Sequence, residues 1–261
     1  MLGILFEIVL PFVLSVLIVI IITVAAEKFG TKVGGIIGLL PSTIIVVYVF
    51  IALSQGIMFA SNSVAVVPAE IGINLVFICV FAIFLYRSTI VAIISSFFIW
   101  VVLSGILFYL DIQSIYLSIV IFTVFMISTF IVLEKKFKIK SQGKRVVHYT
   151  ALKILFRGIF AGIFITVAVL LSNVGEVISG IFSVFPTIFF STMLITVKEH
   201  GPGFSSSIAK SMIFGSPSVT SYAVGIHFLY PKYGIFWGSI FAFILSVIVT
   251  SVILILRKKI S

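Results

Sequence analysis

Hydrophobic residues fall in long runs along the chain, and short polar segments separate these runs. An α-helix needs about 20 such residues to cross the hydrocarbon core of a bilayer, and each run is close to that length. The pattern predicts an all-α, polytopic membrane protein with about nine transmembrane helices. The predicted spans cover about 2–25, 33–54, 60–86, 88–110, 112–134, 151–172, 177–197, 205–229 and 233–256.

The composition supports a membrane protein and excludes an ordinary soluble domain. Of the 261 residues, 62% are hydrophobic and 9% are charged, whereas a typical soluble domain has about 25% charged residues. The first run lacks the basic start of a signal peptide and exceeds its usual apolar length of about 7–15 residues, so we expect a retained helix. Cys79 is the only cysteine, which excludes a disulfide within the chain.

The basic residues predict the orientation, because Lys and Arg near helix ends stay on the cytoplasmic side. With the N-terminus outside and nine crossings, 16 of the 17 Lys and Arg residues face the cytoplasm, and only Lys232 faces outward. We therefore expect a multi-pass protein of the cell membrane with a cytoplasmic C-terminus. The basic cluster at 135–145 could also bind anionic lipid headgroups. Membrane lipid is the expected partner; nucleic acid is not, since no basic face stands on a soluble domain.

The second half of the chain repeats a pattern of the first half. Gly35 and Pro41 recur 145 residues later as Gly180 and Pro186. The match includes glycine and proline at fixed spacing as well as interchangeable aliphatic residues. Further matches are Gly56 with Gly201, Phe59 with Phe204 and, after a shift of four, Pro68 with Pro217.

These matches predict two four-helix membrane repeats, 1–110 and 150–261. The segment between them, 111–149, would hold a linking transmembrane helix and a basic cytoplasmic connector. Because an odd number of crossings precedes the second unit, that unit would enter the membrane upside down. We therefore expect inverted repeats.

Four prolines interrupt the predicted spans near the bilayer midplane: Pro41, Pro68, Pro186 and Pro217. A proline inside a helix costs about 3 kcal/mol or more. One interpretation is a kink that helps helices pack, with neighbouring glycines allowing close approach. The other is functional, because paired interruptions in inverted halves indicate the central site of a transporter.

Polar residues gather at the level of these breaks, and Glu70 is the only acidic residue near the middle of a span. An ionisable group at that depth is costly and suggests function. Glu70 could be a tolerated protonated acid, a hydrogen-bond anchor between helices, or a proton- or cation-coupling carboxylate. The hydroxyl groups could instead bond to their own helix. The predicted substrate or ion site comprises Ser42, Thr43, Glu70, Asn74, Thr187, Ser216, Ser218, Thr220 and Ser221.

Other charged residues and motifs indicate neither a metal nor a catalytic centre. We interpret Lys153 and Arg157 as interfacial residues, although Arg157 could meet an anionic substrate. The sequence contains no HExxH motif, no aspartate-rich pair and no GxSxG motif, which are the signatures of several enzyme classes. We therefore expect no enzyme, no cofactor and no metal site.

Four short motifs of the second half suggest a family. They are SGIFSVFPTIFF at 179–190, KEHG at 198–201, SSS at 205–207 and FGSPS at 214–218. Over about 165–250 the chain resembles the GlpM-type small membrane proteins, which look like single four-helix units with a Phe-Pro-Thr core. The first half is less similar, because LPST at 40–43 lacks the phenylalanine and SQG at 54–56 lacks the acidic residue.

The resemblance implies a duplicated and fused relative of that family, which is named for an association with envelope polysaccharide production. Together with the repeats, the pattern predicts a transporter or permease for a small solute or ion with a midplane site between inverted repeats. The alternative is a non-transporting membrane scaffold or accessory protein, for example in envelope polysaccharide production. One carboxylate among many hydroxyls, led by Glu70, fits an uncharged or cationic species better than an anion.

The orientation can be tested with reporter fusions. A reporter that works only in the cytoplasm should be active when it is inserted in the 134–149 connector or after Ser261. A reporter that works only outside the cytoplasm should be active when it is placed before Met1. If the N-terminus and the connector lie on the same side, the number of crossings before the second unit is even and the inverted-repeat hypothesis fails.

Overall fold

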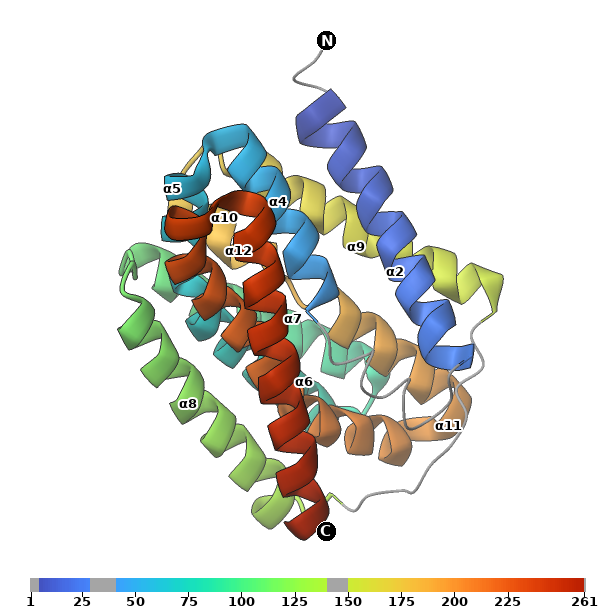
Figure 1. Cartoon of the computed structure of the whole chain (residues 1–261). Helices are drawn as coiled ribbons and strands as arrows, with labels where there is room; N and C mark the ends of the chain where they lie inside the picture. Colours follow the sequence, from blue (N-terminus) through green and yellow to red (C-terminus); the bar gives the residue numbers. More distant parts are fainter. Residues whose placement is uncertain (1–4, 29–40, 140–149, 261) are drawn as a thin grey trace.

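The computed structural model describes residues 5–28, 41–139 and 150–260, and every regular element in these ranges is a helix (Figure 1). The prediction of an all-α fold is confirmed. In chain order the helices are η1 Leu5–Val9, α2 Leu10–Lys28, α4 Ser42–Gln55, α5 Ile57–Ser63, η2 Val64–Val66, α6 Val67–Phe84, α7 Thr89–Tyr109, α8 Ile115–Ile131, η3 Val132–Lys136, α9 Ala151–Leu171, α10 Glu176–Ser183, α11 Thr187–Ile213 and α12 Ser216–Ile260.

The described helices include six runs that are long and apolar enough to cross a membrane. Nine were predicted, and the numbers differ because one run of 78 residues, Glu176–Ile253, contains several helices. The predicted span 33–54 begins outside the described residues and continues as α4, which has 14 residues. The chain is a helical multi-pass membrane protein.

The 78-residue run reverses direction at two glycines. At Gly234, with φ 71° and ψ −177°, α12 folds back on itself, so that Ser218 Oγ lies 2.8 Å from Ser246 Oγ. At Gly201, with φ 80° and ψ 177°, α11 reverses in the same way, and Thr196 Oγ1 donates to Ser205 Oγ at 3.1 Å. Positive φ is inexpensive only for glycine, so each reversal depends on that residue.

The first half shows the same backbone conformations at the matching positions. Gly56, between α4 and α5, has φ 93° and ψ 163°. Pro41 (φ −78°, ψ 50°) and Pro186 (φ −72°, ψ 40°) immediately precede α4 and α11. Both prolines are buried. The two halves therefore share a proline, a helix and a reversing glycine at the spacing found in the sequence.

The other two prolines also lie where a helix begins. Pro68 is in the first turn of α6, after the 3₁₀ turn η2, and Pro217 is the second residue of α12. Proline is well tolerated there, because the first N–H groups of a helix have no intrahelical partner. The high cost expected for an interior proline is therefore not incurred at these positions.

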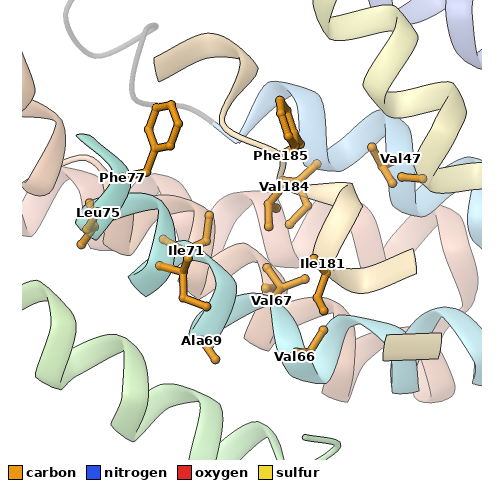
Figure 2. Packing of buried hydrophobic residues seen from close by; sticks show 14 of the residues in the cluster. Val47, Val66, Val67, Ala69, Ile71, Leu75, Phe77, Ile181, Val184 and Phe185 are labelled. Carbon is orange, nitrogen blue, oxygen red and sulfur yellow. The ribbon is translucent and has the colours of Figure 1, made fainter. Parts of the chain in front are cut away.

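The run that forms α5 and α6 is the central one. In an apolar 18-residue stretch of this run 83% of the residues are buried, whereas the corresponding shares are 28% in α7 and 22% in the run that contains α8. The outer faces of α7 and α8 carry exposed residues such as Phe98 and Tyr116. Figure 2 shows Ile181 and Val184 of the second half pointing toward Val66 and Val67 of the first half. The two halves thus pack around this run.

Close contacts between helices depend on small residues. Gly158 and Gly162 of α9 lie against Val16 of α2, and Gly180 of α10 lies against the backbone of Ser63. In lipid, helices associate through close packing of this kind because burial of apolar surface gives little driving force. These glycines hold the first half against the second.

The contact at Gly180 can be tested by adding one methyl group. A Cβ at this position would overlap with the Ser63 carbonyl oxygen and with Val66, so Gly180→Ala should destabilise the protein by about 1–3 kcal/mol. Gly105→Ala is the matched control, because a Cβ there meets nothing within 4 Å. Thermal unfolding in detergent should show a loss for the first variant only. Equal midpoints would contradict the packing of α10 on α5.

Candidate functional site

Glu70 lies on α6 with its side chain completely buried. Both of its carboxyl oxygens are 3.0 Å from the hydroxyl oxygen of Ser104 on α7. Trp100, one helical turn before Ser104, lies beside the same carboxyl, and its indole nitrogen is buried without a hydrogen-bond partner among the described residues. No Lys, Arg or His in the described ranges forms an ion pair with Glu70.

Asn74, one turn after Glu70, connects the two halves of the chain. Its Nδ2 group donates to the carbonyl oxygen of Val184 at 2.6 Å. Val184 immediately follows the last residue of α10 and lies two residues before Pro186, so its carbonyl lacks the partner that a continuous helix would supply. In lipid such a group must find another partner, and Asn74 provides one.

The predicted hydroxyl groups of α12 face mainly their own helix or hairpin. Ser216 donates to Ile213 O at 2.8 Å, Ser221 donates to Ser218 O at 2.9 Å, and Ser218 bonds to Ser246. Thr220 Oγ1 is buried and has no hydrogen-bond partner within the described segments. Thus only some of these hydroxyls could still bind a ligand without giving up a bond.

The remaining predicted residues start the helices that follow the two matched prolines. Thr187 is buried at the first position of α11. Ser42 and Thr43 are half-buried at the start of α4. Of the nine predicted residues, Glu70 and Asn74 are therefore the pair that the structure places one turn apart against both α7 and α10.

Aromatic rings fill the space next to the Pro186 break. Phe185 stacks on Phe164 with ring centroids 3.6 Å apart and contacts Trp100 edge-on at 4.8 Å. Phe97 contacts Phe77 and Phe190 edge-on at 5.2 and 5.0 Å. Through Trp100, this cluster reaches the Glu70 carboxyl.

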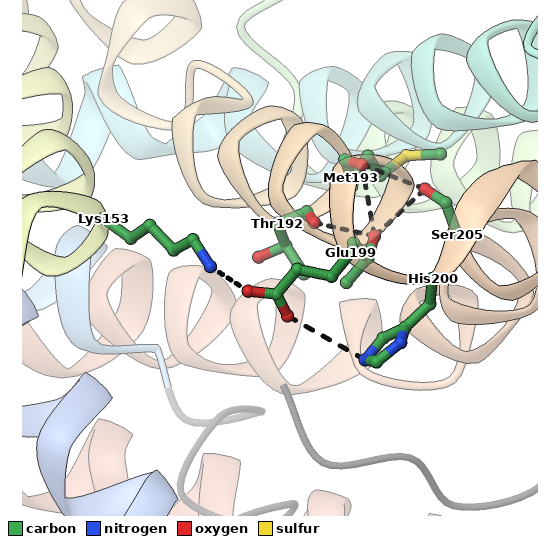
Figure 3. A network of polar contacts seen from close by, with 7 residues as sticks. Lys153, Thr192, Met193, Glu199, His200 and Ser205 are labelled. Carbon is green, nitrogen blue, oxygen red and sulfur yellow. Dashed lines mark hydrogen bonds and ion pairs between the residues drawn. The ribbon is translucent and has the colours of Figure 1, made fainter. Parts of the chain in front are cut away.

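A second polar cluster, which the sequence did not predict, lies where α11 reverses at Gly201 (Figure 3). Lys153 of α9 forms an ion pair with Glu199, whose other carboxyl oxygen is 3.9 Å from His200. Arg157, expected at the interface, is only 8% exposed and donates to Thr192 at 2.8 Å. The available signal was the KEHG motif, in which the acidic residue lies two positions before the reversing glycine.

The opposite end of the molecule has a related polar contact. Ser54, which corresponds to Glu199 at the repeat offset (199 − 54 = 145), donates to Glu7 at 3.2 Å. Glu7 lies one residue from the counterpart of Lys153 (153 − 145 = 8). In both halves, the start of the first helix therefore contacts the residue two positions before the reversing glycine.

No family model, curated protein or solved structure matches this chain. Among the described residues, no group of three or more His, Cys, Asp or Glu side chains could hold a metal ion. The features of this chain that bear on function are therefore the helix starts after the matched prolines and the buried polar groups beside them.

The bond between Asn74 and Val184 can be tested with Asn74→Leu. This variant keeps the side-chain size but leaves the Val184 carbonyl without its partner, which should cost about 1–3 kcal/mol. Asn62→Leu is the control, because Asn62 is exposed and bonds to Glu176 at the surface. Thermal unfolding should separate the two variants, and an unchanged midpoint for Asn74→Leu would show that the break does not need this bond.

Proposed function

We propose that this protein is a transporter or permease for a small solute or ion, with a site at midplane level beside Glu70. The observation that carries the proposal is the pair of helix starts after the matched residues Pro41 and Pro186, with the interruption between α10 and α11 held by Asn74 from the other half. Interrupted helices in corresponding positions of two repeats are typical of transporter binding sites.

The proposal includes two inverted four-helix repeats, 1–110 and 150–261, with α8 as the linking helix between them. Three structural facts support it: the similar backbone conformations at the matched prolines, the positive φ at Gly56 and Gly201, and the related polar contacts in the two halves of the chain. The contact Glu7–Ser54 lies beside Gly56, and the contact Lys153–Glu199 lies beside Gly201. Each repeat would thus close one end of the molecule.

In this proposal Glu70 is the group that binds the coupling ion or the solute. Its carboxyl has a hydroxyl neighbour, Ser104, and no cationic partner in the described part of the chain. Such a carboxyl can accept a proton or a small cation. Asn74 is a positioning residue that binds the Val184 carbonyl at the neighbouring break.

The scaffold remains the alternative, and the aromatic cluster favours it. Rings such as Phe164, Phe185 and Trp100 pack directly beside the break, and a transporter would have to separate them to admit a solute. A relationship to the GlpM-type proteins, and a role in envelope polysaccharide production, would fit either function and stay predictions.

Proton flux into liposomes tests the role of Glu70. The full chain is reconstituted in vesicles that contain a pH-sensitive dye, and a potassium gradient with valinomycin drives proton entry. We expect flux from the wild type and its loss in Glu70→Gln, because the amide keeps the size and the bond to Ser104 but cannot carry a proton. Glu176→Gln is the control, since Glu176 bonds to the exposed Asn62.

The possible results distinguish the hypotheses. Equal flux from wild type and Glu70→Gln would remove Glu70 from the mechanism while leaving transport intact. Loss in both glutamine variants would indicate damage unrelated to the buried site. Wild-type vesicles that admit neither protons nor sodium or potassium ions faster than empty vesicles would favour the scaffold.

A further inference from the structure

A cavity of about 250 Å³ opens at the end of the molecule where α6 and η3 finish. Its lining includes Tyr86 after α6, Phe137 and Lys138 after η3, and Gly203 of α11. None of these residues belongs to the Glu70 site. The cavity is therefore separate from the Glu70 site.

Lys138 occupies an unusual backbone position at the edge of this cavity. Its φ is 49°, a left-handed conformation that costs about 1–2 kcal/mol for a residue with a side chain. The turn is closed by bonds from Phe137 N to Val132 O and from Ile139 N to Leu133 O, both 3.0 Å. Glycine is the usual residue at this place after a helix, so a lysine here has a cost in backbone free energy.

The charge of Lys138 is also not neutralised within the described residues. Lys210, which bonds to the neighbouring Ile139 carbonyl at 3.0 Å, forms an ion pair with Glu134. Lys138 is exposed and forms no ion pair across the described ranges. The Lys138 ammonium group at the edge of the cavity could therefore bind an anion.

The other walls indicate what kind of anion fits. Ile83, Phe137 and Ile139 supply apolar surface, and Tyr86 supplies an exposed phenol ring. Tyrosine is common at the level of lipid headgroups. One lysine beside apolar walls suits an amphiphile better than a free inorganic ion, which would need several donors around it.

We propose that this cavity binds the phosphate headgroup of an anionic phospholipid, with Lys138 as its counter-ion and the apolar walls against the first acyl carbons. The flanking residues Arg87, Lys135 and Lys136 attract anionic lipid to the same end of the molecule. Binding there would tie the end of α6 to the turn after η3 and to the reversal of α11. The proposal does not depend on transport by the Glu70 site.

The key variant is Lys138→Gly, because glycine adopts the left-handed conformation without cost. It removes the charge while keeping or raising the stability of the lipid-free protein. The full chain in detergent is titrated with phosphatidylglycerol or phosphatidylcholine, and bound lipid is counted by native mass spectrometry. Wild type should prefer phosphatidylglycerol, and the variant should bind it about fivefold more weakly, as expected for one lysine at a membrane surface.

Two controls separate a defined site from general attraction. Lys136→Gln removes a neighbouring exposed charge outside the cavity lining and should weaken phosphatidylglycerol binding clearly less than Lys138→Gly does. Lys232→Gln removes a charge on another helix and should leave the preference nearly unchanged. An equal loss in Lys136→Gln and Lys138→Gly would overturn the site in favour of diffuse charge. So would an unchanged preference in Lys138→Gly. Displacement of phosphatidylglycerol by millimolar inorganic phosphate would instead indicate a free-anion site and contradict the lipid.

Discussion

The structure depends on the rule that no backbone carbonyl can remain unpaired inside a bilayer. The chain interrupts a helix at Pro186, and the carbonyl of Val184 then needs a partner from elsewhere. The partner is Asn74 of the other half, at 2.6 Å. The break in the second half of the chain is thereby stabilised by α6 of the first half, which lies against it. The same hydrogen bond therefore satisfies the carbonyl at the helix break and joins the two halves of the chain.

Close packing makes that solution possible. α10 can approach α5 and η2 only because residue 180 is a glycine, whose Cα lies against the Ser63 backbone. The same approach brings Ile181 and Val184 onto Val66 and Val67 (Figure 2). As a result, the run Ile57–Phe84 is buried by protein and not by lipid. That explains how a carboxyl such as Glu70 can be accommodated at its depth.

The polar groups of the chain are distributed between its middle and its two ends. In the middle, Glu70 has Ser104 and Trp100 beside it. At one end Lys153 pairs with Glu199, and at the other Glu7 accepts from Ser54. Buried polar groups between polar contacts on either side are compatible with the midplane site of a transporter, which is the function that we propose.

The sequence by itself determined the class of protein, the positions of most helices and the offset of 145 residues between matching glycines and prolines. These follow from local chemistry: long apolar runs must be helical in lipid, and prolines and glycines mark where helices start and reverse. The positions of Pro41, Pro186, Gly56 and Gly201 were therefore visible in the sequence.

The tertiary structure decided which polar groups meet. The bond from Asn74 to Val184, the contact of Glu70 with Ser104 and the ion pair of Lys153 with Glu199 join residues 34 to 110 positions apart. Such pairs depend on how helices pack and rotate against one another, and that orientation is set by close contacts such as Gly180 on Ser63, which no local pattern of residues encodes.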